Sequence, residues 1–440
     1  EYPDLDVRLI ALDRTVVDGA AMNELARAIV GLPGERELVL DERGLKAVRL
    51  APAALERAVG SGTAARLAMQ RPGSLDRLVW RSESRRAPEA GEIEIAVAAA
   101  ALNFRDVMFA QGLIGDDMLS SGFAGPTLGF ECAGRVVRVG EGVADIRPGE
   151  EIVAFAPGSF ATHTTVPAAA VLPVPKGVSL DAAATLPVAF LTAWYGLVQC
   201  ARLEAGETVL IHGAAGGVGL AAMQIARARG ARIVATAGSP EKRALVRLYG
   251  ADAVYDSRDT QFAETLRAEG GCDVVLNSLA GRPMELSLRA LKPFGRFVEL
   301  GKRDFVANTS IGLRPFARNL TYFGVDADQL IAARPALAQQ MLAELKRLFE
   351  AGTLRPLPHR VFAADDVRAA FRLMQGAGHV GKILVRPPAD ISAMPSEKPA
   401  FVAAGEGVHV VVGGTGGFGR ETARWLAERG AKHVVVASRR

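Results

Sequence analysis

Cysteine and histidine are scarce in this sequence of 440 residues. It has three cysteines, Cys132, Cys200 and Cys272, and six histidines, and no two cysteines have the CxxC spacing. This scarcity argues against a disulfide framework and against a four-cysteine zinc lobe. The few thiols are typical of a reducing compartment, so we expect a cytoplasmic protein.

Long apolar runs and a strong excess of one charge are also missing. No run approaches eighteen apolar residues, and residues 1–10 lack the basic segment and apolar core of a signal peptide, so we expect no membrane span. The 52 basic and 48 acidic residues give a net charge of +4 and are spread along the chain. This balance predicts no nucleic acid partner, and a single anionic cofactor or substrate could account for the small excess.

Glycine is the residue in excess. The chain has 47 glycines in a composition of 49% hydrophobic and 23% charged residues, which is otherwise typical of globular proteins. Glycine suits tight nucleotide-binding turns because it tolerates backbone conformations that other residues avoid. The length allows two or three hydrophobic cores, so we expect several domains.

The first half of the chain changes its pattern near residue 72. Before it, a strand-like run at 7–12, helical spacing at 18–29 and a second strand-like run at 37–40 predict a fragment of a small α/β unit. After it, short strands separated by glycine-rich turns predict an antiparallel, partly barrelled domain; they lie at 92–99, 134–139 and 151–155.

Helix and strand alternate from residue 180 onward, which predicts a doubly wound parallel sheet. The alternating segments are 208–212, 218–228, 232–235, 241–249, 262–268, 273–277, 284–291 and 296–300. A periodic helix at 336–351 and a strand at 381–385 follow, and four prolines between 387 and 399 mark a linker. A last strand, glycine loop, helix and strand, at 408–412, 421–429 and 433–437, predict the beginning of a second nucleotide fold.

The strongest local motif is the glycine loop in residues 209–219, VLIHGAAGGVG. A buried strand runs into small residues and then into an amphipathic helix, so the backbone can approach a pyrophosphate and the helix N-terminus can donate N–H groups to it. A tight strand-to-helix turn without a ligand is the alternative. We expect the cofactor to contact Gly213, Ala214, Gly216, Gly217, Val218 and Gly219.

Basic residues follow the second strand of this fold, where NAD-selective proteins usually carry an acidic residue for the ribose. The sequence here reads GSPEKR over residues 238–243. Lys242, with Ser239 and either Arg243 or Arg258, could pair with a 2′-phosphate, so we predict NADPH rather than NADH. The alternative is that these are solvated charges at a helix start.

Residues 72–386 resemble the enoyl reductase of modular polyketide synthases and animal fatty acid synthase, a zinc-free branch of the medium-chain dehydrogenase/reductase superfamily. The resemblance rests on the glycine loop and on ordered matches at 72–76 (PGSLD), 101–106 (ALNFRD), 129–134 (GFECAG), 185–187 (TLP), 192–195 (TAWY), 277–279 (NSL), 301–302 (GK) and 379–383 (HVGKI). It implies an α/β protein with the medium-chain reductase fold. A GroES-like, partly barrelled β domain at 72–190 and 326–387 would enclose a Rossmann domain with a doubly wound parallel sheet at 191–325.

The two ends resemble pieces of a ketoreductase. Residues 1–71 are similar to the end of its structural subdomain, and residues 405–440, after a linker at 388–404, to the start of its catalytic subdomain. The GGTGGFG loop at 413–419 resembles that subdomain's cofactor loop, and residues 438–440 its 2′-phosphate site, although Val412 stands where many relatives have Thr. The Ser, Tyr and Lys of ketoreduction would lie beyond Arg440, so we expect no ketone reduction at that site.

The same resemblance implies a zinc-free site. Zinc-dependent relatives commonly carry a His in a Gly-His-Glu motif, and Phe130 takes that position here. None of the histidines lies in a recognisable ligand pattern, so we expect His163 and His212 to be satisfied strand residues. We therefore predict no metal.

Family membership would also assign the reaction and its residues. The β-carbon of an enoyl thioester accepts hydride and the α-carbon a proton, which requires positioned reactants and a stabilised carbonyl oxygen. The resemblance places Lys302 at this site with an acidic partner, Asp326 as first choice and Asp328 as second. Their pairing would orient the ammonium as the acid for the α-carbon, or be a structural ion pair while water delivers the proton. Asn103 would face the nicotinamide or thioester, or else cap a turn.

The resemblance extends to cofactor contacts, substrate and partners. Thr192, Asn277 and Lys382 would contact NADPH, and the enoyl group would arrive on the phosphopantetheine of an acyl carrier protein beside the ketoreductase and dehydratase domains of the same synthase. Many members carry a Tyr linked to one stereochemical outcome where this chain has Ile114, so we expect the opposite α-configuration for an α-branched substrate. The alternatives are a free-standing quinone or enone oxidoreductase and a non-catalytic remnant.

Overall fold

A computed structural model describes residues 9–12, 23, 25–26, 37–41, 44–47, 62–69, 73–115, 119, 122–392, 403 and 407–438. The chain divides into two compact units, Glu1–Ala58 and Val59–Arg440. In the first unit, β1 (Leu9–Leu12) pairs in parallel with β2 (Glu37–Asp41), which pairs antiparallel with β3 (Gly44–Ala47). The strands predicted at 7–12 and 37–40 are thus present where described, and most of the helix predicted at 18–29 lies outside the described residues.

The substrate lobe is built on a seven-stranded sheet with the order β10-β8-β7-β6-β18-β17, and β9 also pairs with β6. Its long central strand, β6 (Glu92–Leu102), alternates Ile93, Ile95 and Val97 into the hydrophobic core and then continues in small alanines. The other members are β7 (Glu131–Val139), β8 (Glu151–Phe155), β9 (His163–Pro167), β10 (Val171–Pro173), β17 (His359–Phe362) and β18 (Lys382–Val385). The predicted partly barrelled domain is confirmed.

A hairpin of β4 (Thr63–Met69) and β5 (Leu78–Ser84) belongs to this lobe. Leu67 donates its backbone N–H to Phe160 O at 2.8 Å and its side chain lies in the lobe's core. The boundary predicted between residues 71 and 72 is therefore misplaced, because it falls inside this hydrogen-bonded hairpin. The boundary predicted between 190 and 191 likewise falls inside a continuous helix, α5 (Pro187–Trp194).

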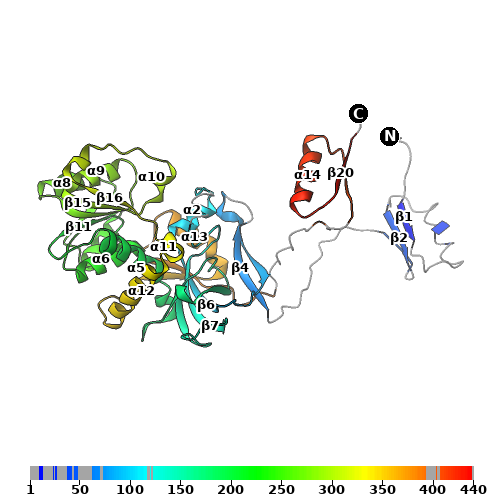
Figure 1. Ribbon diagram of the computed structural model, residues 1–440, viewed down its shortest axis with the longest axis horizontal. Helices are drawn as coiled ribbons and strands as arrows, with labels where there is room; N and C mark the ends of the chain where they lie inside the picture. The colour runs from blue at the N-terminus through cyan, green and yellow to red at the C-terminus, as the bar shows by residue number, and fades with distance from the viewer. Residues whose placement is uncertain are drawn as a thin grey trace. The chain divides into compact units, whose positions relative to one another are not determined.

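The Rossmann lobe is a parallel sheet of six strands with the order β13-β12-β11-β14-β15-β16. Its outer strands are β12 (Arg232–Ala237) and β13 (Ala253–Asp256) on one side and β15 (Leu291–Glu299) and β16 (Thr321–Gly324) on the other. Its central strand, β11 (Thr208–Ile211), is buried along its whole length, and the strand order reverses between β11 and β14 (Cys272–Asn277). Figure 1 shows α8 (Gln261–Ala268) and α9 (Arg282–Ala290) on one face and α5 and α6 (Gly217–Ala228) on the other. The doubly wound sheet predicted from the sequence is confirmed, with its switch point at the glycine loop.

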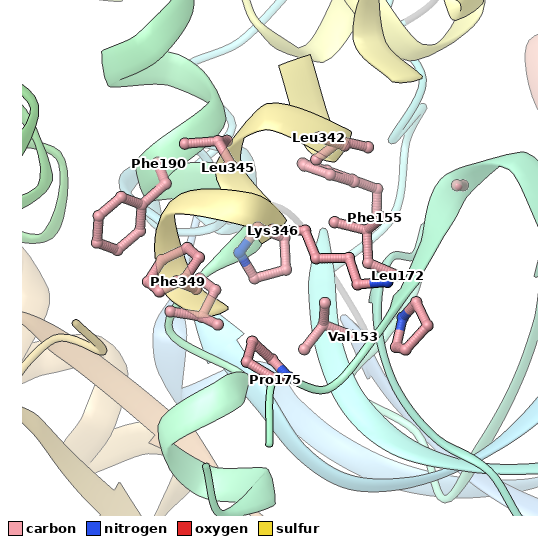
Figure 2. Close-up of a pocket in the computed structure, with 13 residues that line it drawn as sticks. Val153, Phe155, Leu172, Pro175, Phe190, Leu342, Leu345, Lys346 and Phe349 are labelled. Atoms are coloured by element: carbon pink, nitrogen blue, oxygen red, sulfur yellow. The ribbon is translucent and has the colours of Figure 1, made fainter. Parts of the chain in front are cut away.

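One helical stretch, Leu180–Cys200, is long and apolar enough to cross a membrane, but 67% of its apolar window is buried inside the fold. It contains α5, which packs against α12 (Pro335–Glu350) with the rings of Phe190 and Phe349 edge-on at 4.8 Å. Figure 2 shows the apolar pocket between these helices and the substrate sheet, in which Lys346 is the charged lining residue. The stretch is thus a helical part of the hydrophobic core that lies between the two lobes.

The last described segment is a strand-helix-strand unit. β19 (His409–Val412) pairs in parallel with β20 (Val434–Ala437) across α14 (Gly417–Glu428), and Thr415 Oγ1 donates to Ser438 Oγ at 2.7 Å. The predicted strand, glycine loop, helix and strand are confirmed. Arg439 and Arg440 lie outside the described residues, as does most of the linker predicted at 388–404.

Candidate active site

The glycine loop connects β11 to α6 at the switch point of the sheet. Gly213 has a φ of +61°, and a Cβ at Gly219 would lie 2.5 Å from Cα of Ala214, so neither position accepts a side chain without strain. The six residues predicted for cofactor contact all lie in this loop or in the first turn of α6. The loop therefore carries little side-chain bulk beside the first N–H groups of the helix. A dinucleotide pyrophosphate can approach these N–H groups and accept hydrogen bonds from them.

Two cations lie after neighbouring strands of the sheet: Lys242 follows β12 and Arg258 follows β13. Ser239 caps α7 (Pro240–Leu248) by accepting the Lys242 N–H at 3.3 Å, and Lys242 Nζ donates to Ala377 O at 2.6 Å. Burial and the nearby Arg258 lower the pKa of Lys242. Arg243 is instead paired with Asp256 at 2.7 Å, whereas no carboxylate among the described residues pairs with Lys242 or Arg258. The predicted residues thus form a basic site that suits a phosphate dianion.

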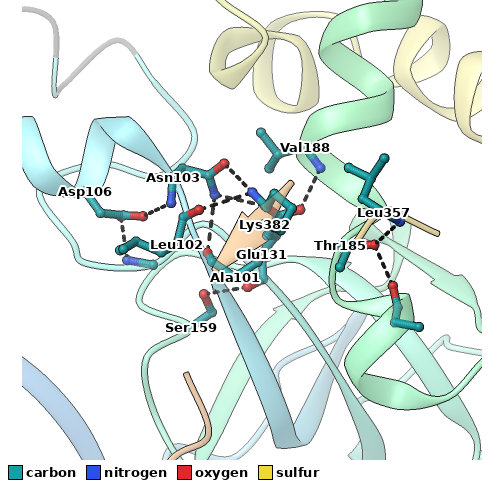
Figure 3. A network of polar contacts seen from close by, with 12 residues as sticks. Ala101, Leu102, Asn103, Asp106, Glu131, Ser159, Thr185, Val188, Leu357 and Lys382 are labelled. Carbon is teal, nitrogen blue, oxygen red and sulfur yellow. Dashed lines mark hydrogen bonds and ion pairs between the residues drawn. The ribbon is translucent and has the colours of Figure 1, made fainter. Parts of the chain in front are cut away.

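A buried polar network joins β18 to the start of α2 (Phe104–Ala110), and Figure 3 shows its members converging. Lys382 Nζ donates to Glu131 Oε1 at 2.6 Å and to Asn103 Oδ1 at 2.8 Å, and Asn103 Nδ2 donates to Glu131 Oε1 at 2.9 Å. Glu131 also accepts the Val188 N–H at 2.8 Å. A Cβ at Gly217 would lie 2.7 Å from Cδ of Lys382, so the lysine stem packs directly against the glycine loop.

Phe130 directly precedes Glu131 of this network and stands where the resemblance would place the histidine of a Gly-His-Glu motif. Phe130 is buried there and its ring packs edge-on against Phe155 at 5.9 Å. In the described part of the chain, no group of three or more His, Cys, Asp or Glu side chains is placed to hold a metal ion. The absence of zinc stays a prediction, which a stoichiometric metal in the pure protein would contradict. His163 lies in β9 beside Thr162, and His212 lies just beyond the end of β11, buried with hydrogen bonds to Thr236 and Ser287. Both are hydrogen-bonded as expected, although His212 is not a strand residue.

Lys302 begins α10 (Lys302–Val306), just beyond β15 (Leu291–Glu299). Its ammonium is paired with Asp326 Oδ2, and the two side chains remain 23% and 24% exposed, so a substrate can reach them. Asp328 lies elsewhere: it accepts the Ala124 N–H at 2.8 Å and faces Arg105 Nε at 3.4 Å. Of the two carboxylates considered from the sequence, Asp326 is the partner of Lys302.

Glu299 organises the turn that leads to Lys302. It accepts Asn277 Nδ2 at 2.6 Å and the Gly301 N–H at 2.7 Å, and burial raises its pKa to about 7. Asn277 Nδ2 also donates to Leu279 O, so its side chain is engaged within the turn. Thr192 lies half-buried on α5. Glu299 was missed from the sequence because a single carboxylate at a strand position forms no recognisable motif. Glu131 lies in the match at 129–134, but its role was missed because its partner Lys382 is 251 residues away in the chain.

The segment after α2 contains Ile114, which is buried in a small cluster with Met108 and Leu119. Residues 116–118 and 120–121 lie outside the described residues. The expected α-configuration stays a prediction. Asp106 of the same helix is also buried, which raises its pKa to about 6, although the N–H groups of Asn103 and Gly129 partly offset this.

Family comparisons match three parts of the chain. Residues 89–176 match the alcohol dehydrogenase GroES-like domain, 249–385 the zinc-binding dehydrogenase family and 407–440 the KR domain. Among solved structures, the CurK enoyl reductase is 41% identical with a TM-score of 0.69, covering 74% of this chain and 99% of that one. The chain belongs to the enoyl reductases of the medium-chain dehydrogenase/reductase superfamily. The JamJ enoyl reductase, at 32% identity and a TM-score of 0.68, has the same coverage.

Curated relatives of this enoyl reductase include polyketide synthases. A phenolphthiocerol/phthiocerol polyketide synthase of Mycobacterium tuberculosis is 41% identical over 391 residues, or 88% of this chain and 18% of that protein. A mycocerosic acid synthase-like polyketide synthase of Mycolicibacterium smegmatis is 38% identical over the whole chain and 21% of its own length. The chain thus spans about a fifth of the length of these relatives. Membership makes it an oxidoreductase that acts on enoyl groups with a nicotinamide cofactor.

Proposed function

We propose that this chain uses NADPH to reduce the α,β-double bond of an enoyl thioester held on an acyl carrier protein during cytoplasmic polyketide synthesis. The observation that carries the proposal is the accessible Lys302–Asp326 ion pair just beyond β15, in the lobe that carries the glycine loop and the basic site of Lys242 and Arg258. The other domains of the same synthase, including a ketoreductase and a dehydratase, would supply the substrate, since the relatives are multidomain synthases and residues 407–440 match a KR domain.

Some residues of the site would bind the cofactor, and others would deliver the proton. The glycine loop would hold the pyrophosphate, and Lys242 and Arg258 the 2′-phosphate. The nicotinamide supplies the hydride for the β-carbon when the cofactor is bound. Lys382 and Asn103, which are hydrogen-bonded to each other and to Glu131, would hold the substrate-lobe side of the site in place against the glycine loop. Lys302 would deliver a proton to the α-carbon from its ammonium, which Asp326 orients.

The test follows NADPH absorbance while a crotonyl thioester of pantetheine or carrier protein is supplied, with NADH in parallel. Lys302→Ala should lower kcat at least about a hundredfold, as expected for loss of a general acid. The matched control is Arg303→Ala, the exposed basic residue that follows, which should leave kcat nearly unchanged. NADPH binding without oxidation by any thioester would contradict the proposal.

A quinone-reducing activity is the second candidate. A quinone oxidoreductase of Pseudomonas syringae is 26% identical to this chain with a TM-score of 0.66, so the fold also serves small acceptors. Quinones and carrier thioesters are therefore compared as oxidants of NADPH in the same assay. A higher kcat/KM for quinones would favour this candidate over the thioester reductase.

A further inference from the structure

The segment between α13 (Val367–Gln375) and β18 connects the basic site to the glycine loop. At one end, Ala377 O accepts the Lys242 ammonium at 2.6 Å. At the other, Gly381 donates its N–H to Ala215 O at 2.8 Å and forms an isolated parallel bridge with Gly216. His379 lies midway along this segment, between the residues that contact the basic site and the glycine loop, where the phosphates of a dinucleotide would bind.

The segment has little freedom to move. Gly381 has a φ of +61°, and a Cβ at this position would lie 1.9 Å from Pro358 O, so only glycine fits. The next residue, Lys382, is anchored by its buried ion pair with Glu131. The backbone on the C-terminal side of His379 is therefore fixed against the glycine loop.

The ring of His379 has an unsatisfied nitrogen. Nδ1 is buried and has no hydrogen-bond partner, the one such side-chain atom among the described residues. Buried polar atoms in native folds are almost always hydrogen-bonded, because leaving one without a partner costs stability. An atom that is unsatisfied in the protein alone but lies at a ligand site is explained by a ligand that supplies the missing partner.

The charge around the ring indicates what that ligand is. The charged groups that act on the ring are Lys242 from α7 and Lys382 from β18, and together with burial, the larger cause, they lower the pKa of His379 to about 4. The ring is thus neutral near neutral pH and surrounded by positive charge. An anion placed there would be attracted by both ammonium groups and would favour the protonated, doubly donating imidazole.

We propose that His379 is a further cofactor-binding residue, whose ring donates a hydrogen bond to a phosphate oxygen of the dinucleotide and takes up a proton when that phosphate binds. This inference rests on the proposed function only in taking a nicotinamide dinucleotide as the ligand. The shared chemistry is a phosphate, and the geometry allows the pyrophosphate or the 2′-phosphate as its source.

The proposal has a definite pH dependence. Because a bound phosphate raises the pKa of His379 above its value of about 4 in the free protein, affinity increases as pH falls between the two values. The 2′-phosphate titrates near the same range, so the wild type has to be compared with a variant in which only the histidine is missing.

The experiment is calorimetric titration of the full chain with NADPH at about pH 6 and about pH 8, in buffers that differ in ionisation enthalpy. We expect the wild type to take up a proton on binding NADPH near pH 6, and His379→Gln to lose this uptake and to bind NADPH roughly tenfold or more weakly. The control is His359→Gln, an exposed histidine of β17 whose Nδ1 contacts Leu357 O. Its affinity and proton uptake should match the wild type.

Two further ligands identify the phosphate. If NADH loses affinity in His379→Gln as NADPH does, the contact is with the pyrophosphate; if adenosine 2′-phosphate loses affinity and NADH does not, it is with the 2′-phosphate. Either result supports the proposal. An unchanged NADPH affinity and unchanged proton uptake in His379→Gln would overturn it.

Stability without cofactor distinguishes a binding role from a structural one. Because Nδ1 has no partner in the free protein, His379→Phe should not lower the melting temperature, while it should weaken NADPH binding like His379→Gln. A lowered melting temperature with unchanged NADPH affinity would overturn the inference. Failure of the wild type to bind NADPH would instead refute the proposed function, and binding without thioester turnover would refute the function while leaving the role of His379 intact.

Discussion

Lys242 has a charge that no carboxylate in the described part of the chain neutralises, and Arg258 lies close enough to lower its pKa. A 2′-phosphate would relieve this repulsion. We predict that Lys242→Ala raises the Kd for NADPH about tenfold to a hundredfold, as expected for loss of a charge-assisted hydrogen bond, and leaves the Kd for NADH nearly unchanged.

Fluorescence titration with both cofactors measures this effect. Arg247→Ala is the matched control, because Arg247 is an exposed basic residue on the same helix and should alter neither Kd. Equal weakening of NADPH and NADH by Lys242→Ala would show that the lysine supports the fold of the site rather than the 2′-phosphate.

Glu94 should make stability depend on acid pH. Its side chain is 1% exposed and is paired with Arg85 at 2.8 Å and with Arg138 at 2.5 Å. Burial alone would raise the pKa of Glu94, but the hydrogen bonds from both arginines lower it from 4.5 to about 2. Because the folded pKa lies below the unfolded one, the stabilisation is present above about pH 4.5 and is lost as pH falls towards 2.

Glu94→Gln should accordingly cost roughly 3 kcal/mol of unfolding free energy at neutral pH, and the difference from wild type should shrink towards acid pH. Urea denaturation at several pH values provides the measurement. Glu89→Gln, an exposed partner of Arg86, is the control and should cost little. A Glu94→Gln deficit that is the same at every pH would mean that lost packing, and not the ion pairs, causes it.

At the scale of elements, the loop before α11 (Asp328–Ala333) links the two lobes. Asp326 and Asp328 are two residues apart, yet one faces Lys302 and the other accepts the Ala124 N–H and faces Arg105 of the substrate lobe. The Asp328 N–H also donates to Asp326 Oδ1 at 3.2 Å. A substitution at Asp328 should therefore shift the side chain of Asp326 and weaken its ion pair with Lys302, because only one residue separates the two aspartates.

We predict that Asp328→Asn lowers the unfolding free energy by about 2 kcal/mol, because it leaves the largely buried Arg105 guanidinium without its carboxylate partner, and lowers kcat while the Kd for NADPH stays near its wild-type value. Asp365→Asn, an exposed aspartate, is the control. Denaturation and steady-state kinetics on the same samples test this. A change in NADPH affinity with wild-type kcat would contradict a positioning role.

The elements that the sequence predicted are those with strong local patterns. The buried strand β11 and the amphipathic helix α6 follow from residues 208–228 alone. The hairpin of β4 was not predicted, because its place depends on pairing with β5 and on a bond from Leu67 to Phe160. The Glu131–Lys382 pair was not predicted either: its members are 251 residues apart and only the folded chain brings them together.

At the scale of the whole molecule, a nucleotide-binding lobe and a substrate lobe each contribute residues to the candidate site. Lys302 with Asp326 comes from the first and Asn103 with Glu131 from the second, and Lys382 packs between the substrate lobe and the glycine loop. The resemblance named Asn103 and Lys302 because each lies in a short motif of this sequence, and Asp326 as the acidic partner of Lys302. Glu131 lies in the match at 129–134, but its bond to Asn103 emerges only from the structure.

Enoyl reduction by NADPH is tested most directly by finding which carbon of the product receives the hydride. NADPH deuterated at the transferable C4 position is incubated with a crotonyl thioester of the carrier protein, and the product is analysed by mass spectrometry and NMR. The account predicts one deuterium on the β-carbon of a saturated thioester, with the α-proton drawn from solvent or a solvent-exchanged side chain. Deuterium on the carbon of the thioester carbonyl, or no saturated product despite bound NADPH, would contradict the account.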